Sequence, residues 1–396
     1  MESGSSSSSK EYDVIVLGAG VEGSSTAYNL TKNGGGRVLL LEQFSALHTR
    51  GSSHGGSRIT RRAYTKAYYI KMMDEAYRMW DQIEREGKTQ LYLDTGLLMF
   101  GPKSSHCLQD AIRCLAESGT PHNRLSAQQV MSKYPSQLYL PFNHEGVFEK
   151  DGGLLMATKA VATLQRLFIE NGGEFLDGHK VKEITPGPII RVTTDQGVFT
   201  ARRLIITAGA WAPAIMATLG VHLPFKVCRT EVLYWKAEEP KDFSWENFPA
   251  FICYTDSEDP YYHVYGLPIY EYPGLVKICF HTNHNEVDPD ARDALPGPST
   301  TDLVRPFVQR HFKGVQTTPS IYEACMYTES PDEDPVLDRH PLYPNIIMGA
   351  GFSGHGFKLA PVVGKILTEL ALDLPSSYDL APFRLDRFTW QSPAKL

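Results

Sequence analysis

The sequence has no pair of cysteines in a CxxC arrangement, and its six cysteines lie at positions 107, 114, 228, 253, 279 and 325. A chain of 396 residues can build a sizeable core without the disulfide framework that small secreted domains need. We therefore expect thiols in a reducing compartment rather than a set of disulfide bonds.

Long apolar segments are also missing. The longest uncharged stretch, Leu204 to Val221, is interrupted by Gly209, Pro213 and Gly220, which argues against a transmembrane helix. Basic residues are not in excess, because 39 basic and 45 acidic residues give a net charge of −6. This balance argues against nucleic-acid or membrane binding that rests on bulk charge.

The two ends of the sequence lead to different expectations. Residues 1–10 are rich in serine and lack the apolar core and cleavage site of a secretory signal, so we expect a disordered tail. Residues 394–396 read AKL and differ by one small residue from the SKL peroxisomal signal. We expect an import receptor to bind this tripeptide and the protein to be peroxisomal; an ordinary frayed tail is the alternative.

The length predicts about two domains, and no fixed-period repeat is present, which excludes solenoids and propellers. Residues 12–42 have the pattern strand, glycine turn, helix, glycine turn, strand, which predicts a parallel βαβ unit. Two further apolar runs, 204–206 and 346–348, also lead into glycines. Apolar side chains spaced along 66–86 predict a helix with one buried face.

Residues 223–300 differ from the rest of the chain, because they are rich in tyrosine, proline and acidic residues. They contain β-type stretches at 261–265 and 275–280. We therefore predict a nucleotide-binding layer assembled from distant segments, with a β-rich domain inserted into it.

The glycines Gly18, Gly20 and Gly23 form a GxGxxG turn between the first strand and the helix. The first allows a tight turn, the second lets a pyrophosphate approach the backbone, and the third lets helix and strand pack closely. Glu42, at the end of the next strand, can bind ribose hydroxyls and disfavours a 2′-phosphate, which argues against NADP. This motif alone leaves NAD and FAD both open.

A second glycine turn, Gly349 to Gly354, is followed by the helical stretch 362–372 instead of a strand that ends in an acid. It is not a second dinucleotide turn. It can still present backbone N–H groups and a helix N-terminus to a negatively charged ring system. A tight turn without a ligand is the alternative.

Residues 51–62 are rich in glycine and serine, and arginines lie at positions 50, 58, 61 and 62. Their place directly after the second strand favours a site for an anionic ligand, and a flexible basic surface loop is the alternative. His281 and His284 have H-x-x-H spacing, but no third or fourth ligand accompanies them, so we predict no metal site. No nucleophile elbow, Walker loop or EF-hand is present.

Several of these motifs together resemble the sarcosine oxidase family of FAD-dependent amine oxidases. They are the dinucleotide turn, GSSHGGSRITRRAY at 51–64, Lys277 followed by His281, ACMYT at 324–328 and GFSGHGFK at 351–358. The resemblance covers the chain from about residue 11 onward. It implies a mixed α/β and α+β fold like that of amino acid oxidases, with a discontinuous Rossmann-type FAD-binding domain (11–88, 148–222, 322–390) and an inserted β-rich substrate domain (89–147, 223–321).

The resemblance also implies roles for individual residues. Cys325, which its apolar surroundings alone would make a buried thiol, would bind FAD covalently. Arg61 and Lys358 would hold the substrate carboxylate, and Lys277 would activate dioxygen beside the flavin. His54 and Arg58 would lie near the flavin ring and take part in catalysis, and Tyr265 and His281 would line the substrate pocket. The implied cofactor-binding residues are Gly18, Gly20, Gly23, Glu42, Ser53, Arg58, Gly209, Cys325, Gly351, Gly354 and Lys358.

We therefore expect a monomeric flavoprotein oxidase of small secondary amino acids, sarcosine or L-pipecolate. The C–N bond would be oxidised to an imine that hydrolyses in water, and dioxygen would be reduced to hydrogen peroxide. Two alternatives remain among enzymes, a flavin dehydrogenase that uses a protein electron acceptor and an NAD-dependent dehydrogenase. The third is a dinucleotide-binding protein without catalytic activity.

Overall fold

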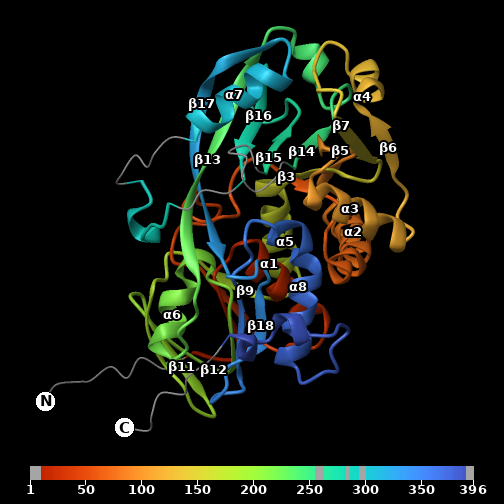
Figure 1. Cartoon of the computed structure of the whole chain (residues 1–396). Coiled ribbons are helices and arrows are strands. Elements are labelled where there is room, and N and C mark those ends of the chain that lie inside the picture. Colours follow the sequence, from red (N-terminus) through yellow and green to blue (C-terminus); the bar gives the residue numbers. More distant parts are fainter. Residues whose placement is uncertain (1–9, 255–262, 282–284, 294–299, 389–396) are drawn as a thin grey trace, which may run out of the picture. The chain divides into compact units, whose positions relative to one another are not determined.

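A computed structural model describes residues 10–254, 263–281, 285–293 and 300–388 of the chain (Figure 1). The C-terminal tripeptide, His284 and residues 1–9 of the predicted tail lie outside the described residues. Residue 10 does not belong to a tail, because Lys10 begins the first strand and pairs in register with Phe199. None of the six cysteines, all of which are described, forms a disulfide bond. Within the described residues, no helix has the length and apolarity that crossing a membrane requires.

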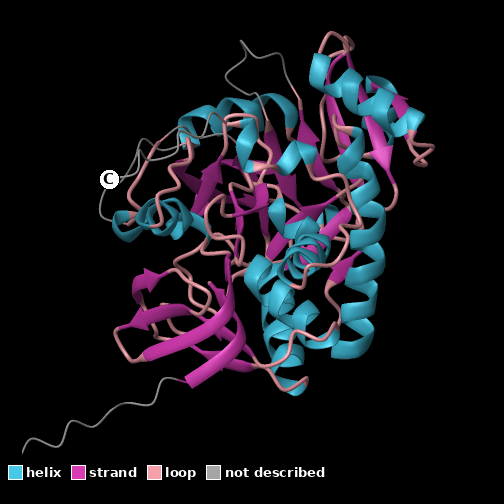
Figure 2. Ribbon diagram, turned by 90° about the horizontal axis from the view of Figure 1, so that it is seen from below, coloured by secondary structure: helices cyan, strands magenta, loops and turns pink. Residues whose placement is uncertain are grey.

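The chain divides into two compact units. Unit 1 comprises residues 1–54, 161–226 and 328–396, and unit 2 comprises residues 55–160 and 227–327. The α-helix α5 (Ala157–Glu170) contains one of the boundaries. Both helices and strands are present throughout the chain, as the mixed fold class predicts, and Figure 2 colours the two kinds of element.

The boundaries of these units differ from those of the predicted domains. Residues 55–88 and 148–160, expected in the FAD-binding domain, belong to unit 2, because β3 (Ser57–Thr60) pairs with β8 (Gly153–Met156), which also pairs with β4 (Tyr92–Leu93). Residues 322–327 belong to unit 2 as well, because β17 (Val315–Glu329) continues without a break through this boundary. Residues 223–226, expected in the substrate domain, belong to unit 1.

Unit 1 is built on a sheet with strand order β10-β11-β12-β1-β2-β9, in which β19 pairs with β12 and β18 with β19. Its strands are β1 (Lys10–Leu17), β2 (Val38–Leu41), β9 (Glu174–Leu176), β10 (Val181–Thr185), β11 (Ile190–Thr194), β12 (Val198–Ile206), β18 (Val336–Arg339) and β19 (Ile346–Ala350). Its helices are α1 (Val21–Lys32), α6 (Ala212–Thr218) and α8 (Gly356–Ala371), with short 3-10 turns η1 (Gly209–Trp211), η4 (Ala381–Phe383) and η5 (Leu385–Arg387).

The three predicted strand-then-glycine segments lie side by side in this sheet. The central strands β2, β1, β12 and β19 are parallel, with Leu17 paired to Ile206 and Ile206 to Met348. Their apolar runs are buried on both faces, as parallel strands covered by helices require. The glycine turns that follow them therefore lie together at the carboxyl ends of these strands, where ligands of open α/β sheets bind.

Unit 2 contains a second sheet with the order β17-β13-β16-β15-β14-β5-β7-β6, in addition to the small sheet β3-β8-β4. The remaining strands are β5 (Leu97–Pro102), β6 (Asn123–Ser126), β7 (His144–Glu149), β13 (Lys226–Ala237), β14 (Ala250–Cys253), β15 (Val264–Leu267) and β16 (Leu275–Phe280). Its helices are α2 (Ala67–Gly87), α3 (His106–Glu117), α4 (Ala127–Lys133) and α7 (Thr301–His311), with 3-10 turns η2 (Pro240–Phe243) and η3 (Pro289–Ala291).

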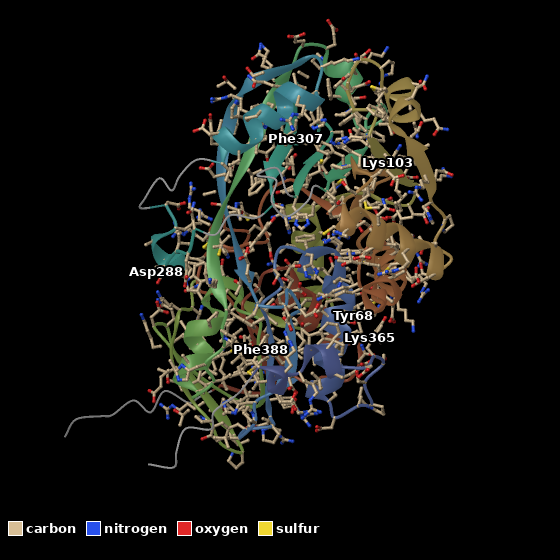
Figure 3. The ribbon with its side chains drawn as sticks, in the orientation of Figure 1. Tyr68, Lys103, Asp288, Phe307, Lys365 and Phe388 are labelled. Carbon is tan, nitrogen blue, oxygen red and sulfur yellow. The ribbon has the colours of Figure 1, made fainter. Side chains whose placement is uncertain are left out.

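The predictions for this part of the chain are confirmed where it is described. The helix expected over 66–86 is α2, whose apolar face is buried, and the run 275–280 is β16. Of the expected stretch 261–265, residues 261 and 262 lie outside the described residues. Apolar side chains of α7 and the large sheet form one core cluster, in which Phe307, labelled in Figure 3, stacks on Phe251 at a centroid distance of 6.5 Å.

Candidate functional site

The turn between β1 and α1 requires glycine at two positions. Gly18 has a φ of +93°, and a Cβ there would lie 2.7 Å from the carbonyl oxygen of Thr207. A Cβ on Gly23 would lie 1.8 Å from the carbonyl oxygen of Gly18, so only glycine lets α1 pack this closely on the strand end. The roles predicted for the first and third glycines therefore have a geometric basis.

Glu42 and Ser53 meet the N-terminus of α1. The Oε2 atom of Glu42 accepts a hydrogen bond from the backbone N–H of Ala19 at 2.9 Å, and the Oγ of Ser53 accepts one from Val21 at 3.0 Å. A Cβ on Gly20 would lie 3.0 Å from the Ser53 Oγ. Gly20 has no side chain and so leaves room for a pyrophosphate at the N-terminus of α1. The backbone N–H groups there can donate to its oxygens, and the buried acid Glu42 can bind the ribose.

Three other residues of unit 1, His48, His54 and Gly209, follow strands β2 and β12. His48, which the sequence analysis did not identify, lies with its Nε2 3.4 Å from the Glu42 Oε1. The Nδ1 of His54 lies 2.6 Å from the carbonyl oxygen of Gly51 and so fixes the ring to its own loop. Gly209, at the end of β12, has a φ of +53° and open space where a Cβ would point.

The second glycine turn connects β19 to α8. Gly351 and Gly354 have φ angles of +78° and +77°, and Ser353 between them has a φ of +46°. This turn brings the first residues of α8 to the same sheet edge as α1, and Lys358 lies in that first turn. Lys358 is buried, and its Nζ donates a hydrogen bond to the carbonyl oxygen of His355 at 3.1 Å.

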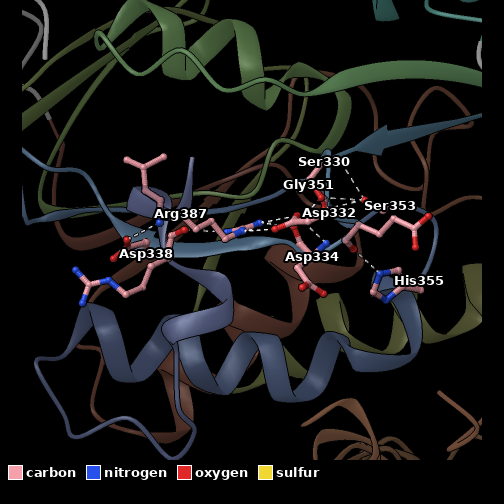
Figure 4. A network of polar contacts seen from close by, with 11 residues as sticks. Ser330, Asp332, Asp334, Asp338, Gly351, Ser353, His355 and Arg387 are labelled. Atoms are coloured by element: carbon pink, nitrogen blue, oxygen red, sulfur yellow. Dashed lines mark hydrogen bonds and ion pairs between the residues drawn. The ribbon is translucent and has the colours of Figure 1, made fainter. Parts of the chain in front are cut away.

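A polar network holds this turn in its strained conformation (Figure 4). The Oγ of Ser353 accepts a hydrogen bond from the N–H of Ser330 at 3.1 Å. Arg387 pairs with Asp332 at 2.7 Å and donates to the carbonyl oxygen of Asp334 at 2.6 Å, which fixes the loop beside Ser330. Burial raises the pKa of Asp332, but the Arg387 guanidinium outweighs this effect and holds that pKa below its ordinary value.

Glu22 is a buried acid that the sequence analysis missed, although an acid inside a GxGxxG turn is a visible signal. In the described part of the chain neither of its carboxylate oxygens has a hydrogen-bond partner. Its Oε1 lies against the start of α8, 2.7 Å from where a Cβ of Gly356 would be. Burial raises the pKa of Glu22 well above its ordinary value, and the charge of Lys358 only partly opposes this shift.

In unit 2, Arg61 lies between aromatic side chains. Its Nη1 donates hydrogen bonds to the hydroxyl of Tyr254 at 3.0 Å and to the carbonyl oxygen of Ala63. The guanidinium lies over the ring of Tyr64, 4.4 Å from its centroid. Glu149 accepts hydrogen bonds from the N–H groups of residues 62 and 63, which fixes the backbone next to Arg61.

Arg62 does not support the sequence-based expectation of an external anion. It pairs with Asp74 at 2.7 Å and with Asp151 at 2.9 Å, so carboxylates of the protein already satisfy it. Arg58 donates to the carbonyl oxygen of Ser57 at 2.7 Å. The four arginines of this loop therefore do not act as one basic patch.

A chain of rings extends from Tyr254 to Tyr327. Ring centroids are 5.4 Å apart for Tyr254 and His263, 5.6 Å for His263 and His281, and 5.4 Å for His281 and Tyr327. Tyr265 lies 6.1 Å from His281. Burial, and then the charge of Arg61, lower the pKa of His263 to about 4, so this imidazole is neutral at neutral pH. The sequence analysis missed Tyr254, His263 and Tyr327.

Cys325 and Lys277 are both buried in unit 2. Cys325 lies on β17 with 5% of its surface exposed. Burial raises the pKa of the neighbouring Tyr327; the charge of Cys325 adds to this shift, and the charge of Arg58 opposes it. Lys277 on β16 is only 3% exposed, so it is not a solvated surface residue, as most lysines are. Its Nζ lies 3.1 Å from the Oε1 of Glu271.

The structure thus groups the predicted residues within each unit. Unit 1 brings together Gly18, Gly20, Gly23, Glu42 and Ser53, and carries the turn with Gly351, Gly354 and Lys358. Unit 2 brings together Arg58, Arg61, Tyr265, His281 and Cys325, and buries Lys277. Of the H-x-x-H pair, His281 belongs to the ring cluster and His284 lies outside the described residues. Among the residues described, no three His, Cys, Asp or Glu side chains are arranged to hold a metal.

The chain is similar to known proteins over nearly its whole length. Residues 13–370 match the family described as FAD dependent oxidoreductase. The chain is 45% identical over 391 residues to the peroxisomal sarcosine oxidase of Mus musculus, covering 97% of this chain and 98% of that protein. It is 44% identical over 380 residues to the peroxisomal sarcosine oxidase of Homo sapiens, covering 95% and 96%. The solved structure of NikD, an unusual amino acid oxidase, superposes with a TM-score of 0.83 at 22% identity over 95% of this chain and 98% of that one, which shows a shared fold.

Proposed function

Because the chain belongs to the family of FAD dependent oxidoreductases, we propose that it is an oxidase of small secondary amino acids, with sarcosine as a substrate. The C–N bond is oxidised to an imine, which water hydrolyses; sarcosine, dioxygen and water give glycine, formaldehyde and hydrogen peroxide. L-Pipecolate, a cyclic secondary amino acid, is the second proposed substrate. FAD, when bound, would supply the acceptor for two electrons from the substrate, with dioxygen as their final acceptor.

The surroundings of Arg61 support this proposal most directly. A partly buried guanidinium whose Nη1 is already bound by Tyr254 and Ala63 can present its Nε and Nη2 groups as two parallel N–H donors for a carboxylate. The neighbouring His263 is neutral, so it does not repel the cation or compete for the carboxylate. The rings of His281 and Tyr265, whose centroids lie 6.1 Å apart, suit a small apolar substituent on the substrate amine. Lys358 is proposed as a second cation for the carboxylate.

Other residues hold and tune the cofactor in this proposal. The glycine turn with Glu42 and Ser53 binds the dinucleotide, and His54, Arg58, Gly209 and the Gly351–Gly354 turn contact its ring system. Cys325 forms a covalent bond to FAD, which prevents loss of the cofactor; its burial in unit 2 and its place in the ACMYT segment support this assignment. Lys277 stabilises the negative charge that develops on dioxygen during its reduction.

The cellular setting is proposed from the same relatives. Two relatives are named peroxisomal, and residues 394–396, outside the described structure, read AKL. We assign the protein to the peroxisome, with an import receptor that binds this tripeptide. It acts as a monomer, and its other partners are its amino acid substrate and dioxygen.

The first test is a visible spectrum of the purified protein before and after acid precipitation. Yellow colour should remain in the pellet of the wild type and move to the supernatant for Cys325→Ser. Colour in the supernatant for both proteins would leave the oxidase proposal intact but remove the covalent role of Cys325. A colourless protein, purified after expression with adequate flavin, would refute the FAD assignment and favour the NAD-dependent alternative.

The second test measures oxygen consumption with sarcosine and with L-pipecolate, together with the hydrogen peroxide formed. One peroxide should form for each amino acid oxidised. If an artificial electron acceptor supports turnover and dioxygen does not, the protein is a flavin dehydrogenase instead. A bound flavin without turnover of either amine would favour the non-catalytic alternative.

A further inference from the structure

Lys277 and Glu271 form a buried ion pair in unit 2. The Nζ of Lys277 lies 3.1 Å from the Oε1 of Glu271, and the two side chains are only 4% and 8% exposed. Glu271 lies in the connection between β15 and β16, and Lys277 lies on β16 itself. The acid and the base are therefore held by one hairpin, six residues apart.

Ser57 of β3 completes this contact. Its Oγ donates a hydrogen bond to the same Oε1 of Glu271 at 2.5 Å. The Nζ of Lys277 lies 3.3 Å from that Oγ and 3.4 Å from the carbonyl oxygen of Ser57. The ammonium thus faces three oxygens in a fixed arrangement, and one of them carries a full negative charge.

Gly56 leaves the space that the Glu271 side chain occupies. A Cβ on Gly56 would lie 2.2 Å from the Cγ of Glu271, closer than atoms can approach, and 3.0 Å from its Cδ, a tight contact. Small residues in the loop 51–57 allow something to come close to the backbone, and at Gly56 that group is the side chain of Glu271. Any larger residue at position 56 must displace this carboxylate.

Among the described residues, the other polar groups near Lys277 do not supply a second direct counter-charge. The ring of Tyr234, paired with Lys277 across β13 and β16, has its centroid 5.7 Å from the Nζ. The hydroxyl of Tyr234 donates a hydrogen bond to Glu323 at 3.2 Å. The Glu323 carboxylate is therefore bound by Tyr234 and not by Lys277. Cys279 is neutral at neutral pH, because burial raises its pKa to about 11.

Glu271 remains ionised in this environment. Burial raises its pKa, but Lys277 and the Ser57 hydroxyl outweigh that effect and hold the pKa below its ordinary value. Burial disfavours an ammonium as it disfavours a carboxylate, and each charge of such a pair sustains the other.

We propose that Glu271 is a positioning residue for the oxygen reaction: it balances the positive charge of Lys277 and fixes its Nζ, and Gly56 provides the room it needs. This inference rests on the proposed role of Lys277 toward dioxygen. Without the carboxylate, burial favours the neutral amine over the ammonium, and the positive charge that assists reduction of dioxygen is weakened. The rate of reaction with dioxygen should then fall with rising pH more steeply in such a variant than in the wild type.

The test measures two rates separately from pH 6 to pH 9.5, flavin reduction by sarcosine without oxygen and reoxidation by dioxygen. Reoxidation of Glu271→Gln should match the wild type within about twofold at pH 6 and fall about tenfold below it at pH 9, with reduction changed by less than about twofold. Gly56→Ala should slow reoxidation in the same way because it displaces the carboxylate. Glu323→Gln, which removes a nearby carboxylate that does not touch Lys277, should behave like the wild type.

A second readout does not depend on activity. Either Glu271→Gln or Lys277→Met alone leaves one buried charge unpaired, so each should lower the melting temperature, and the double variant should regain part of the loss. Melting-temperature losses that simply add would refute a coupled pair.

The outcomes separate this inference from the proposal it rests on. If reoxidation in Lys277→Met is as fast as in the wild type, the role of Lys277 toward dioxygen is wrong. If Lys277→Met slows reoxidation but Glu271→Gln and Gly56→Ala keep wild-type rates at every pH, Lys277 keeps its role and the inference about Glu271 is overturned. Should Glu271→Gln fail to fold, the pH profile of Gly56→Ala decides alone.

Discussion

The Nη1 of Arg61 donates a hydrogen bond to the hydroxyl of Tyr254 over 3.0 Å, and both residues lie in unit 2. Because Tyr254 and the carbonyl of Ala63 both bind this nitrogen, the guanidinium is oriented before a carboxylate arrives. Arg61→Lys keeps the charge but loses the planar pair of donors, so we expect the KM for sarcosine to rise about 10- to 100-fold. Steady-state kinetics check this, and Tyr254→Phe, which removes only the orienting hydroxyl, should raise KM less. An unchanged KM in Arg61→Lys would remove Arg61 from carboxylate binding.

Glu22→Gln should stabilise the protein, and the gain should grow with pH. The pKa of Glu22 in the folded state lies above its unfolded value, so the folded state binds more protons and stability falls as pH rises through this interval. The gain is therefore absent at about pH 4, where the acid is protonated in both states, and reaches about 1–2 kcal/mol once the carboxylate ionises in the fold. Melting curves of both proteins from pH 4 to pH 9 test this. A gain that is constant across pH would contradict the explanation by burial.

Arg387→Ala should loosen the loop that supports the Gly351–Gly354 turn. We expect a melting temperature lower by about 2 °C, because the pair with Asp332 is partly exposed and screened. The folded-state pKa of Asp332 lies below its unfolded value, so this contribution is present above the unfolded pKa and disappears as pH falls through the folded one. The variant and the wild type should therefore converge in acid. Arg384→Ala is the control, since Arg384 pairs with Asp386 at the surface.

Gly23→Ala should prevent correct packing of α1 against the end of β1. The new methyl group would lie 1.8 Å from the carbonyl oxygen of Gly18, a backbone atom that cannot move aside cheaply. We expect little soluble protein and no retained flavin, measured as the absorbance ratio of the purified material. Gly197→Ala is a matched control, because its nearest neighbour would be 3.9 Å away. Normal flavin content in Gly23→Ala would show that the turn tolerates a wider spacing.

The sequence carried enough information for the parallel strands and the glycine turns, because periodicity and glycine position are local signals. The unit boundaries were less accessible, since β3 joins unit 2 through pairing with β8, a strand distant in sequence. Pairing between such segments leaves no trace in the composition of either one. The glycine-rich loop after Glu42 therefore contributes residues to both units.

The site residues divide in the same way. Motif resemblance identified Arg61, His281 and Lys277, but their partners Tyr254, His263 and Glu271 stand outside the quoted motifs. Glu271 illustrates the reason. Its side chain occupies the space beside Gly56, where any other residue would place a Cβ, and neither position alone reveals this contact. Arg62 shows the opposite failure, because a basic loop suggests a ligand until Asp74 and Asp151 are seen to pair with it.

The strand order of unit 1 also determines when each strand can pair with its neighbour during biosynthesis. β1 is synthesised first, yet its neighbour β12 follows only near residue 200, and β19, which pairs with β12, only near residue 350. Until β12 has been synthesised, one edge of the β1–β2 pair has no partner strand, and non-local pairing of this kind is slow and exposes nascent chains to aggregation. The part of the sheet beside the amino-terminal dinucleotide turn is completed only when β19 has been made. Chaperones that shield β1 and β2 therefore have about half of the translation time to cover, up to residue 206 of 396.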